Sequence, residues 1–256
     1  MKMAASLPEE VDAYLAELVK RLQDLLADRL VGIYLFGSAS YDACEHGRSD
    51  LDVQAVVKDP LDAADKQAIV DRLTHKALPC PATKLEFVVY AQSTVHPANR
   101  HPRFELNLNT GSRQADHVSF DPANESSHWF LLDIALGRQL GRSLFGLLTR
   151  DAFAAIPRRW ILEAIADSLK WHQANELASP NSVLNACRGW RYAVTGSFSS
   201  KVEGADWAMQ QAGVPDVIGS AITARGAGGE LPADQVSQLY RLIEGTVNAE
   251  LGTTEA

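Results

Sequence analysis

The sequence predicts an α+β protein in two parts: an N-terminal domain with a mixed β-sheet and flanking helices, and a C-terminal all-α helical bundle. Two observations predict this organisation. Strand and helix patterns alternate until about residue 110, and from about residue 126 onward the apolar residues recur at helical spacing. The stretch between them, 91–124, is rich in His, Pro, Asn and Gly, as is typical of a linker or the border of a site. We place the domains at residues 1–120 and 121–256.

The elements of the first part follow from local patterns. An amphipathic helix is predicted over 7–30, because its leucines and valines recur on one face. Short apolar runs predict strands, and a run with near-helical spacing of Ile69, Val70, Leu73 and Leu78 predicts a helix. In order, these elements are a strand over 31–36, a strand over 49–57, a helix over 61–78, a strand over 84–90 and a strand-like piece over 104–108.

The second part is predicted to be wholly helical. Pro157 and the pair Asn181-Ser182 are typical of helix starts, and Gly196 is typical of a helix end. The predicted helices cover 126–148, 157–177, 181–195, 203–211, 217–224 and 234–251.

Composition excludes several classes of function. The 256 residues are 46% hydrophobic and 22% charged, which is typical of a folded globular protein. A net charge of −8 disfavours nucleic acid as the main partner. We expect a cytoplasmic protein without a membrane partner, because no leader pattern opens the chain and no apolar run reaches the roughly 20 residues of a membrane span. Three widely spaced cysteines, Cys44, Cys80 and Cys187, predict reduced thiols rather than disulfides.

Asp50 and Asp52 are the most informative residues. At positions i and i+2 of a strand, both carboxylates point to one face, where they repel each other unless a cation lies between them. Carboxylate oxygens together with substrate phosphates suit Mg²⁺. The preceding strand ends at Gly37-Ser38, whose backbone N–H groups and hydroxyl are suited to phosphate oxygens. Either motif alone is often a solvated strand end, but together, in this order, they indicate nucleotidyl transfer.

Glu86 is the one charged residue inside the apolar run 85–90. In a neighbouring antiparallel strand it would face the aspartates, as a general base or as a third metal ligand. The alternative is a surface glutamate.

The set Gly37-Ser38, Ser49-Asp50-Leu51-Asp52 and Glu86, followed by a helical bundle, resembles the aminoglycoside nucleotidyltransferases, and most closely the streptomycin/spectinomycin adenylyltransferases. The helical part carries the more specific likeness. Its matching motifs are Asn181-Ser182-Val183-Leu184, Arg188-Gly189-Trp190, Ala193-Val194-Thr195-Gly196, Lys201 and Ala205-Asp206-Trp207-Ala208.

The resemblance implies an N-terminal nucleotidyltransferase domain and a role for each matching residue. Asp50 and Asp52 would bind Mg²⁺, and Glu86 would be the catalytic base. The nucleotide ATP, as co-substrate, would be contacted by residues of both domains: Gly37, Ser38, Ser49, Arg188 and Lys201.

The substrate positions differ from the family pattern. Where streptomycin-modifying members carry a Trp and two Asp residues, this chain has Leu169, Ala174 and Ala178. Trp171 and Glu176 lie close by and are our candidates for substrate binding.

The function expected from these observations is magnesium-dependent transfer of AMP from ATP to a hydroxyl of an aminoglycoside or aminocyclitol, with release of pyrophosphate. The acceptor would be small, polar and cationic. The alternative is a nucleotidyltransferase that modifies a partner protein, as toxin–antitoxin regulators do.

Overall fold

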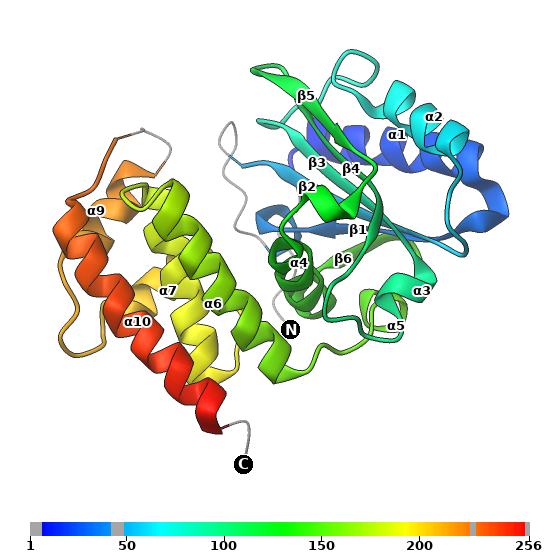
Figure 1. Ribbon diagram of the computed structural model, residues 1–256. Helices are drawn as coiled ribbons and strands as arrows, with labels where there is room; N and C mark the ends of the chain where they lie inside the picture. The colour runs from blue at the N-terminus through cyan, green and yellow to red at the C-terminus, as the bar shows by residue number, and fades with distance from the viewer. Residues whose placement is uncertain (1–6, 42–48, 226–228, 254–256) are drawn as a thin grey trace. The chain divides into compact units, whose positions relative to one another are not determined.

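The computed structural model describes residues 7–41, 49–225 and 229–253 (Figure 1). The chain divides into two compact units, Met1–Ile156 and Pro157–Ala256. The division falls later than the boundary expected after residue 120. The segment between the two boundaries joins the first unit because one of its strands pairs with the central sheet, as described below.

The first unit contains one six-stranded sheet with the order β5-β4-β3-β2-β1-β6. Neighbouring strands are antiparallel, except for β2 and β3, which run parallel. The elements are α1 Glu9–Leu26, β1 Leu30–Phe36, β2 Leu51–Val57, α2 Ala63–Leu73, β3 Leu85–Ala91, α3 Gln92–Val95, β4 Phe104–Gly111, β5 Gln114–Ser119, α4 Ser127–Leu140, β6 Arg142–Gly146 and α5 Thr149–Ala152. Short 3-10 turns lie at Ala27–Arg29, Ser38–Ser40 and Pro122–Asn124.

The antiparallel orientation expected for the strand that carries Glu86 is wrong. The connection from β2 to β3 passes through α2, and a helical crossover returns the chain to the same end of the sheet. The two strands are therefore parallel. The predicted proximity of Glu86 to the aspartates still holds, because both strands begin at the same edge.

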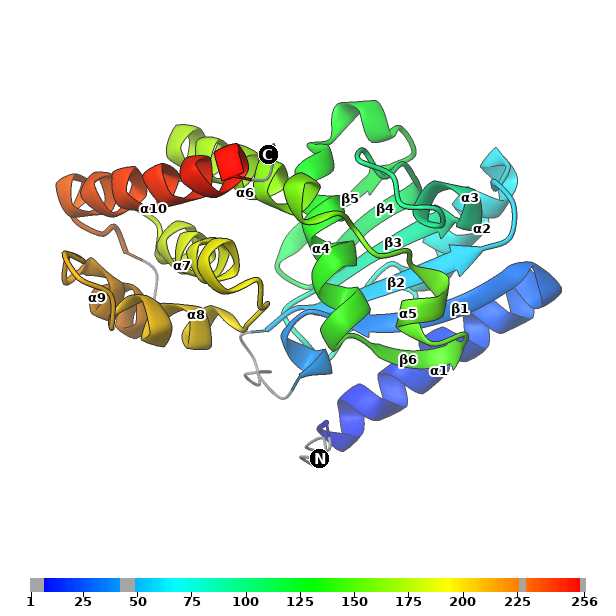
Figure 2. The same ribbon diagram turned by 90° about the horizontal axis from the view of Figure 1, so that it is seen from below.

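Helices cover both faces of this sheet (Figures 1 and 2). Side chains alternate along each strand, so Ile33 and Leu35 of β1 pack with α1 and α2, whereas Tyr34 and Phe36 pack on the other face with α4 and α5. The face towards α1 and α2 is apolar along β2 and β3. The opposite face, covered by α4, carries the polar positions considered below.

Two strands were missed by the sequence patterns. Both β5, with exposed residues along most of its length, and β6, half-exposed, lie at the edges of the sheet. An edge strand that is not buried on either face shows no apolar run and little alternation. The helix expected over 126–148 accordingly ends at Leu140, and β6 takes up the following residues.

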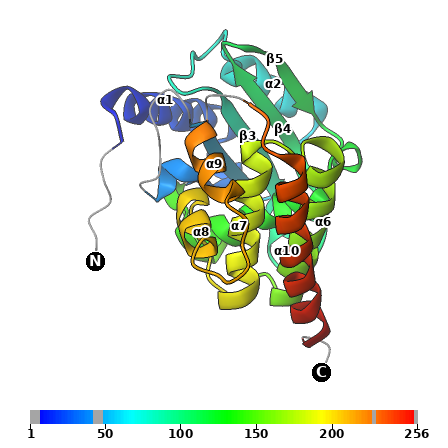
Figure 3. The ribbon, with the colours of Figure 1, turned by 90° about the vertical axis from the view of Figure 1, so that its left-hand side faces the viewer.

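The second unit contains five helices within its described residues: α6 Arg158–Asn175, α7 Pro180–Thr195, α8 Lys201–Ala208, α9 Val217–Ala224 and α10 Ala233–Thr253. The central helix is α7, which packs against the other four (Figure 3). It starts at Ser179, whose hydroxyl accepts a hydrogen bond from Ser182 N–H, and ends at Gly196 in the left-handed conformation. The predicted all-helical character of this part is confirmed.

Cys80 and Cys187 are buried free thiols, and Cys44 lies outside the described residues. Of the helices described, none combines the length and the apolar character required to cross a bilayer.

Candidate active site

The predicted carboxylates gather at the edge of the sheet where β1 ends and β2 and β3 begin. The register places Asp52 opposite Phe36 on one side and opposite Glu86 on the other. Asp50 precedes the first residue of β2, where Leu51 N–H donates to the Lys84 carbonyl at 2.9 Å. The structure therefore brings Asp50, Asp52 and Glu86 together.

Strand alternation decides the face on which these carboxylates lie. Val56 of β2 and Val88 of β3 pack in the core beneath α4, and Asp52 and Glu86 share their parity. Both carboxylates consequently point to the α4 face rather than into the apolar layer beneath α1 and α2. Each residue is only half-buried, so solvent and a substrate can reach it.

Position 37 requires a glycine, because the backbone there approaches the Asp52 carboxylate closely. Its backbone has φ +61° and ψ −162°, a region that essentially only glycine adopts. A Cβ atom at this position would lie 2.6 Å from Asp52 Cγ and nearer still to the carboxylate oxygen Oδ2. The turn after β1 thus passes directly over the Asp52 carboxylate, which is where the sequence predicted a phosphate-binding turn.

Ser38 and Ser49 flank the same edge. Ser38 is half-buried and opens the 3-10 turn, in which the Gly37 carbonyl accepts hydrogen bonds from Ser40 N–H at 3.1 Å and from Ser40 Oγ at 2.9 Å. Ser49 is buried, and its carbonyl accepts a hydrogen bond from Thr83 N–H at 3.2 Å. The first two bonds close the turn after β1, and the third joins Ser49 to the segment that leads into β3.

Lys84 is a cation that the sequence analysis did not single out. Its ammonium contacts the Glu86 carboxylate and lies 3.7 Å from Asp50 Oδ2. Burial by itself lowers the pKa of Lys84, but the charges of Glu86 and Asp50 outweigh it, and the pKa is raised. Lys84 lies directly before β3 and two residues from Glu86, and this i, i+2 spacing was the signal that could have found it.

Asp133 of α4 is a further carboxylate on this face. It is the single acidic residue in the apolar stretch 129–136, which is the signal that could have found it. Burial, followed by the charges of Glu86, Asp133 and Asp50, raises the pKa of Asp52 well above its ordinary value. The site therefore surrounds Asp52 with negative charge, which disfavours its ionised form.

This donor set fits a divalent cation. Within the described residues, no group of three or more His, Cys, Asp or Glu side chains forms a complete metal cage. Mg²⁺ does not need one, since it is usually held by one or two carboxylates together with substrate phosphates. The crowding that raises the pKa of Asp52, and the ammonium of Lys84 between Asp50 and Glu86, both show that these oxygens attract positive charge.

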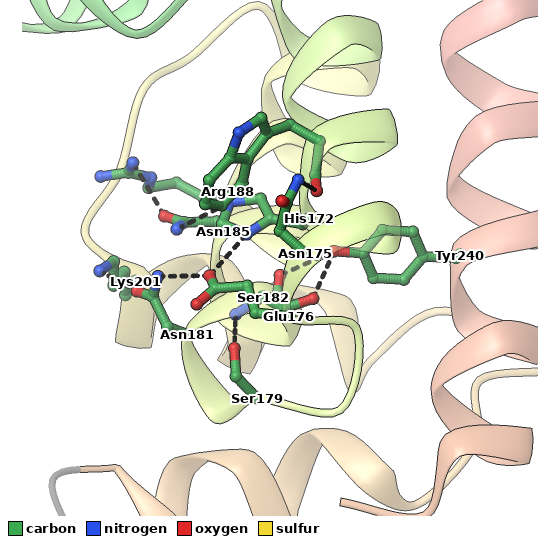
Figure 4. A network of polar contacts seen from close by, with 11 residues as sticks. His172, Asn175, Glu176, Ser179, Asn181, Ser182, Asn185, Arg188, Lys201 and Tyr240 are labelled. Atoms are coloured by element: carbon green, nitrogen blue, oxygen red, sulfur yellow. Dashed lines mark hydrogen bonds and ion pairs between the residues drawn. The ribbon is translucent and has the colours of Figure 1, made fainter. Parts of the chain in front are cut away.

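The remaining predicted residues all belong to the second unit, where Glu176, Arg188 and Lys201 share one polar network (Figure 4). Arg188 donates to Asn185 Oδ1 at 3.1 Å, and Lys201 donates to Asn181 Oδ1 at 2.6 Å. Glu176 accepts a hydrogen bond from His172 at 2.7 Å.

Trp171 of α6 packs its indole edge-on against the imidazole of His172, with ring centroids 5.3 Å apart. His172 is the member of this network that the sequence analysis missed. It is a buried polar residue at the end of a helix, and nothing in its spacing distinguishes it from a core histidine.

Comparison with known proteins confirms the resemblance seen in the motifs. Residues 151–240 match the model of the family described as "Aminoglycoside adenylyltransferase, C-terminal domain". An aminoglycoside (3'') (9) adenylyltransferase of Shigella flexneri is 25% identical over 95% of this chain and 97% of its own length. A spectinomycin 9-adenylyltransferase of Staphylococcus aureus is 28% identical over 90% of this chain and 89% of its own length.

A solved structure agrees in fold. Spectinomycin adenyltransferase AAD(9) from Enterococcus faecialis, crystallised with ATP and spectinomycin, superposes with a TM-score of 0.71 and 18% identity, covering 93% of this chain and 99% of that one. This likeness confirms the predicted fold, a first part with a mixed sheet and flanking helices followed by a helical part. The sequence relatives confirm the prediction of a nucleotidyltransferase. They do not favour the alternative acceptor, a partner protein.

Proposed function

We propose that this chain transfers AMP from ATP to a hydroxyl group of an aminoglycoside or aminocyclitol and releases pyrophosphate. The observation that carries the proposal is the direct pairing of Asp52 with Glu86 across two parallel strands, with Asp50 beside them and Gly37 over the Asp52 carboxylate. This arrangement combines an acidic cation site, a phosphate-binding turn and a candidate base within a few residues.

Glu86 acts as the general base. It is half-exposed, so a hydroxyl of the acceptor can approach it, and the Lys84 ammonium contacts its carboxylate. The acceptor oxygen attacks the α-phosphorus of ATP, the bond to the pyrophosphate oxygen breaks, and the hydroxyl proton passes to Glu86. Removing that proton as the new bond forms avoids a positively charged ester oxygen.

Asp50 and Asp52 hold Mg²⁺ in this proposal. When bound, the metal supplies positive charge that neutralises the phosphate oxygens of ATP. Gly37, Ser38 and Ser49 bind the triphosphate: the first offers a backbone without a side chain, and the two serines offer hydroxyl and backbone donors. Phosphoryl chemistry of this kind depends mostly on such positioning and charge stabilisation.

The helical unit contributes cations and the acceptor site. By their match to the family motifs, Arg188 and Lys201 contact the phosphates of ATP, for which a guanidinium and an ammonium are suited. For the acceptor, Trp171 offers an aromatic surface that would suit a sugar ring. The sequence also suggested Glu176, whose carboxylate would suit an amino group and whose contacts are considered further below. The acceptor is accordingly a small, polar cation, as the named relatives suggest.

The test is pyrophosphate release from ATP and Mg²⁺ in the presence of spectinomycin, streptomycin and a panel of other aminoglycosides. Asp50→Ala is the negative control, because it removes a cation ligand at the edge of the sheet. Mass spectrometry of the antibiotic should show the added AMP.

Release that depends on one of these acceptors and disappears in Asp50→Ala would support the whole proposal. Release with none of them, from a chain that binds ATP with Mg²⁺, would refute the acceptor class and leave the nucleotidyltransferase assignment standing.

A further inference from the structure

A continuous polar chain connects Arg188 and Lys201, two cations of the helical unit (Figure 4). Starting from Arg188, the hydrogen bonds run to Asn185 Oδ1 at 3.1 Å, from Asn185 Nδ2 to His172 Nε2 at 3.3 Å, and from His172 Nδ1 to Glu176 Oε1 at 2.7 Å. The same Glu176 oxygen accepts from a second asparagine at 3.1 Å, which in turn accepts from the second cation at 2.6 Å. We call the four linking residues the polar chain: His172, Glu176, Asn181 and Asn185.

The ends of this chain determine the orientation of every member. Lys201 can only donate and Glu176 can only accept, so the Asn181 amide must turn its oxygen to Lys201 and its nitrogen to Glu176. By the same reasoning Arg188 can only donate, so Asn185 turns its oxygen to Arg188 and its nitrogen towards His172.

His172 is consequently neutral with its proton on Nδ1. Nε2 must accept from the Asn185 amide, which leaves Nδ1–H to donate to Glu176. The surroundings favour this form. His172 is 2% exposed, and its burial, followed by the positive charges of Lys201 and Arg188 and against the opposing effect of Glu176, lowers its pKa. An imidazolium would present a donor to the Asn185 donor and break the chain.

The chain joins three helices. His172 lies in the last turn of α6 and Glu176 caps that helix, both asparagines and Arg188 belong to α7, and Lys201 is the first residue of α8. A close contact supports the arrangement, because a Cβ at Gly204 of α8 would lie 2.9 Å from Arg188 Cα. Only glycine lets α8 approach α7 closely at this point.

We propose that the polar chain positions Arg188 and Lys201 for the phosphates of ATP, and that Glu176 and His172 are positioning residues. This inference rests on the proposed function. Arginine and lysine side chains in solution sample many rotamers, and ordering them on binding reduces affinity. Two cations that are each hydrogen-bonded to an asparagine of α7, within a chain that continues to the end of α6, are already ordered, so ATP meets a preformed pair of charges.

The assignment differs from the role suggested by sequence for Glu176. Its carboxylate accepts from both His172 and Asn181, so the negative charge serves the protein's own groups. We therefore expect Glu176 to influence ATP affinity rather than acceptor affinity.

The test compares ATP binding by two asparagine variants of the full-length chain. Asn185→Leu keeps the branched shape of the side chain and removes both hydrogen bonds of the link between Arg188 and His172. The matched control is Asn175→Leu, because Asn175 is an exposed asparagine nearby whose amide donates to the Trp171 carbonyl at 2.8 Å. The measurement is isothermal titration calorimetry with ATP and Mg²⁺, together with kcat and KM for ATP in the pyrophosphate assay.

We expect the Kd for ATP to rise about tenfold in Asn185→Leu, the scale of one hydrogen bond to a charged group, and to stay within about twofold in Asn175→Leu. KM for ATP should rise with Kd while kcat changes much less, since the chain orders a binding group rather than a reacting one. Equal affinity of Asn185→Leu and the wild-type chain would overturn the inference. A wild-type chain that neither binds ATP nor transfers AMP would instead refute the proposed function.

A second measurement reads the protonation of His172 in the wild-type chain itself. The ¹⁵N NMR shifts of the wild-type chain at pH 7.5, with His172 assigned by its loss in His172→Gln, report which ring nitrogen carries the proton. We expect a neutral ring protonated on Nδ1. An Nε2–H tautomer or an imidazolium would overturn the inference.

Discussion

Gly37→Ala is the substitution for which the structure makes the sharpest prediction. Gly37 has φ +61° and ψ −162°, and its α-carbon faces the Asp52 carboxylate. An alanine there needs a backbone conformation that side chains avoid and a space that Asp52 occupies. We expect loss of AMP transfer together with a moderate loss of stability.

The two effects have separate magnitudes. The added Cβ would lie 2.6 Å from Asp52 Cγ and nearer still to Oδ2, so the carboxylate must move by at least about 1 Å to reach ordinary contact. A misplacement of this size lowers kcat about 100-fold, which corresponds to roughly 2.7 kcal/mol of activation free energy. The strained backbone reduces the free energy of unfolding by about 1–3 kcal/mol, and Tm falls by about 2–10 °C.

Pyrophosphate release measures the activity, and circular dichroism during thermal denaturation measures the stability. The matched control is Gly213→Ala. Gly213 also has a positive φ, +76°, but a Cβ there would have no atom within 4 Å. We expect this control to lose stability and keep its activity, because only the backbone penalty is shared.

The reasoning is refuted if Gly37→Ala retains more than about a tenth of the wild-type kcat at a temperature at which it is folded. That result would mean that Asp52 can move without consequence. A similar loss of activity in Gly213→Ala would refute it as well, because strain alone would then explain the effect.

Four further predictions follow from the same structure. Asp52→Asn should abolish AMP transfer. In magnesium-free buffer it should also raise Tm by about 2–6 °C, because it removes a negative charge that lies close to other carboxylates. A lower Tm in differential scanning calorimetry would contradict this. Glu86→Gln should reduce AMP transfer at least about 100-fold and leave the Kd for ATP within about twofold; calorimetry showing lost ATP binding would assign Glu86 to the nucleotide instead. Ser182→Ala should lower the free energy of unfolding in urea by about 1 kcal/mol, because the buried hydroxyls of Ser182 and Tyr240 hydrogen-bond at 2.6 Å; unchanged stability would refute a role for this pair. The pKa of His172 in the folded chain lies below its ordinary 6.5, so its contribution to stability is fully present above pH 6.5 and is lost as the pH falls through the folded-state pKa. His172→Gln should therefore flatten this part of the curve of Tm against pH. An unchanged slope would argue against a buried neutral ring.

Local patterns predicted the carboxylates that gather at the edge of the sheet where β2 and β3 begin. Asp50, Asp52 and Glu86 were each recognisable because a carboxylate inside an apolar strand is costly unless it is used. The helices of the second unit were also predicted with small errors at their ends, since helical spacing is a local property that survives without knowledge of packing.

The sequence by itself therefore determined the two-part α+β organisation, the carboxylates and the Gly37 turn. Only the tertiary structure decided that β2 and β3 are parallel, that β6 returns to pair with β1, and that Lys84 and Asp133 share the face of Asp52. It also decided that His172 links the two cations. The physical reason is range: spacing along the chain records which face a residue occupies, whereas pairing between distant segments depends on the packing of the whole unit and leaves little trace in either segment alone.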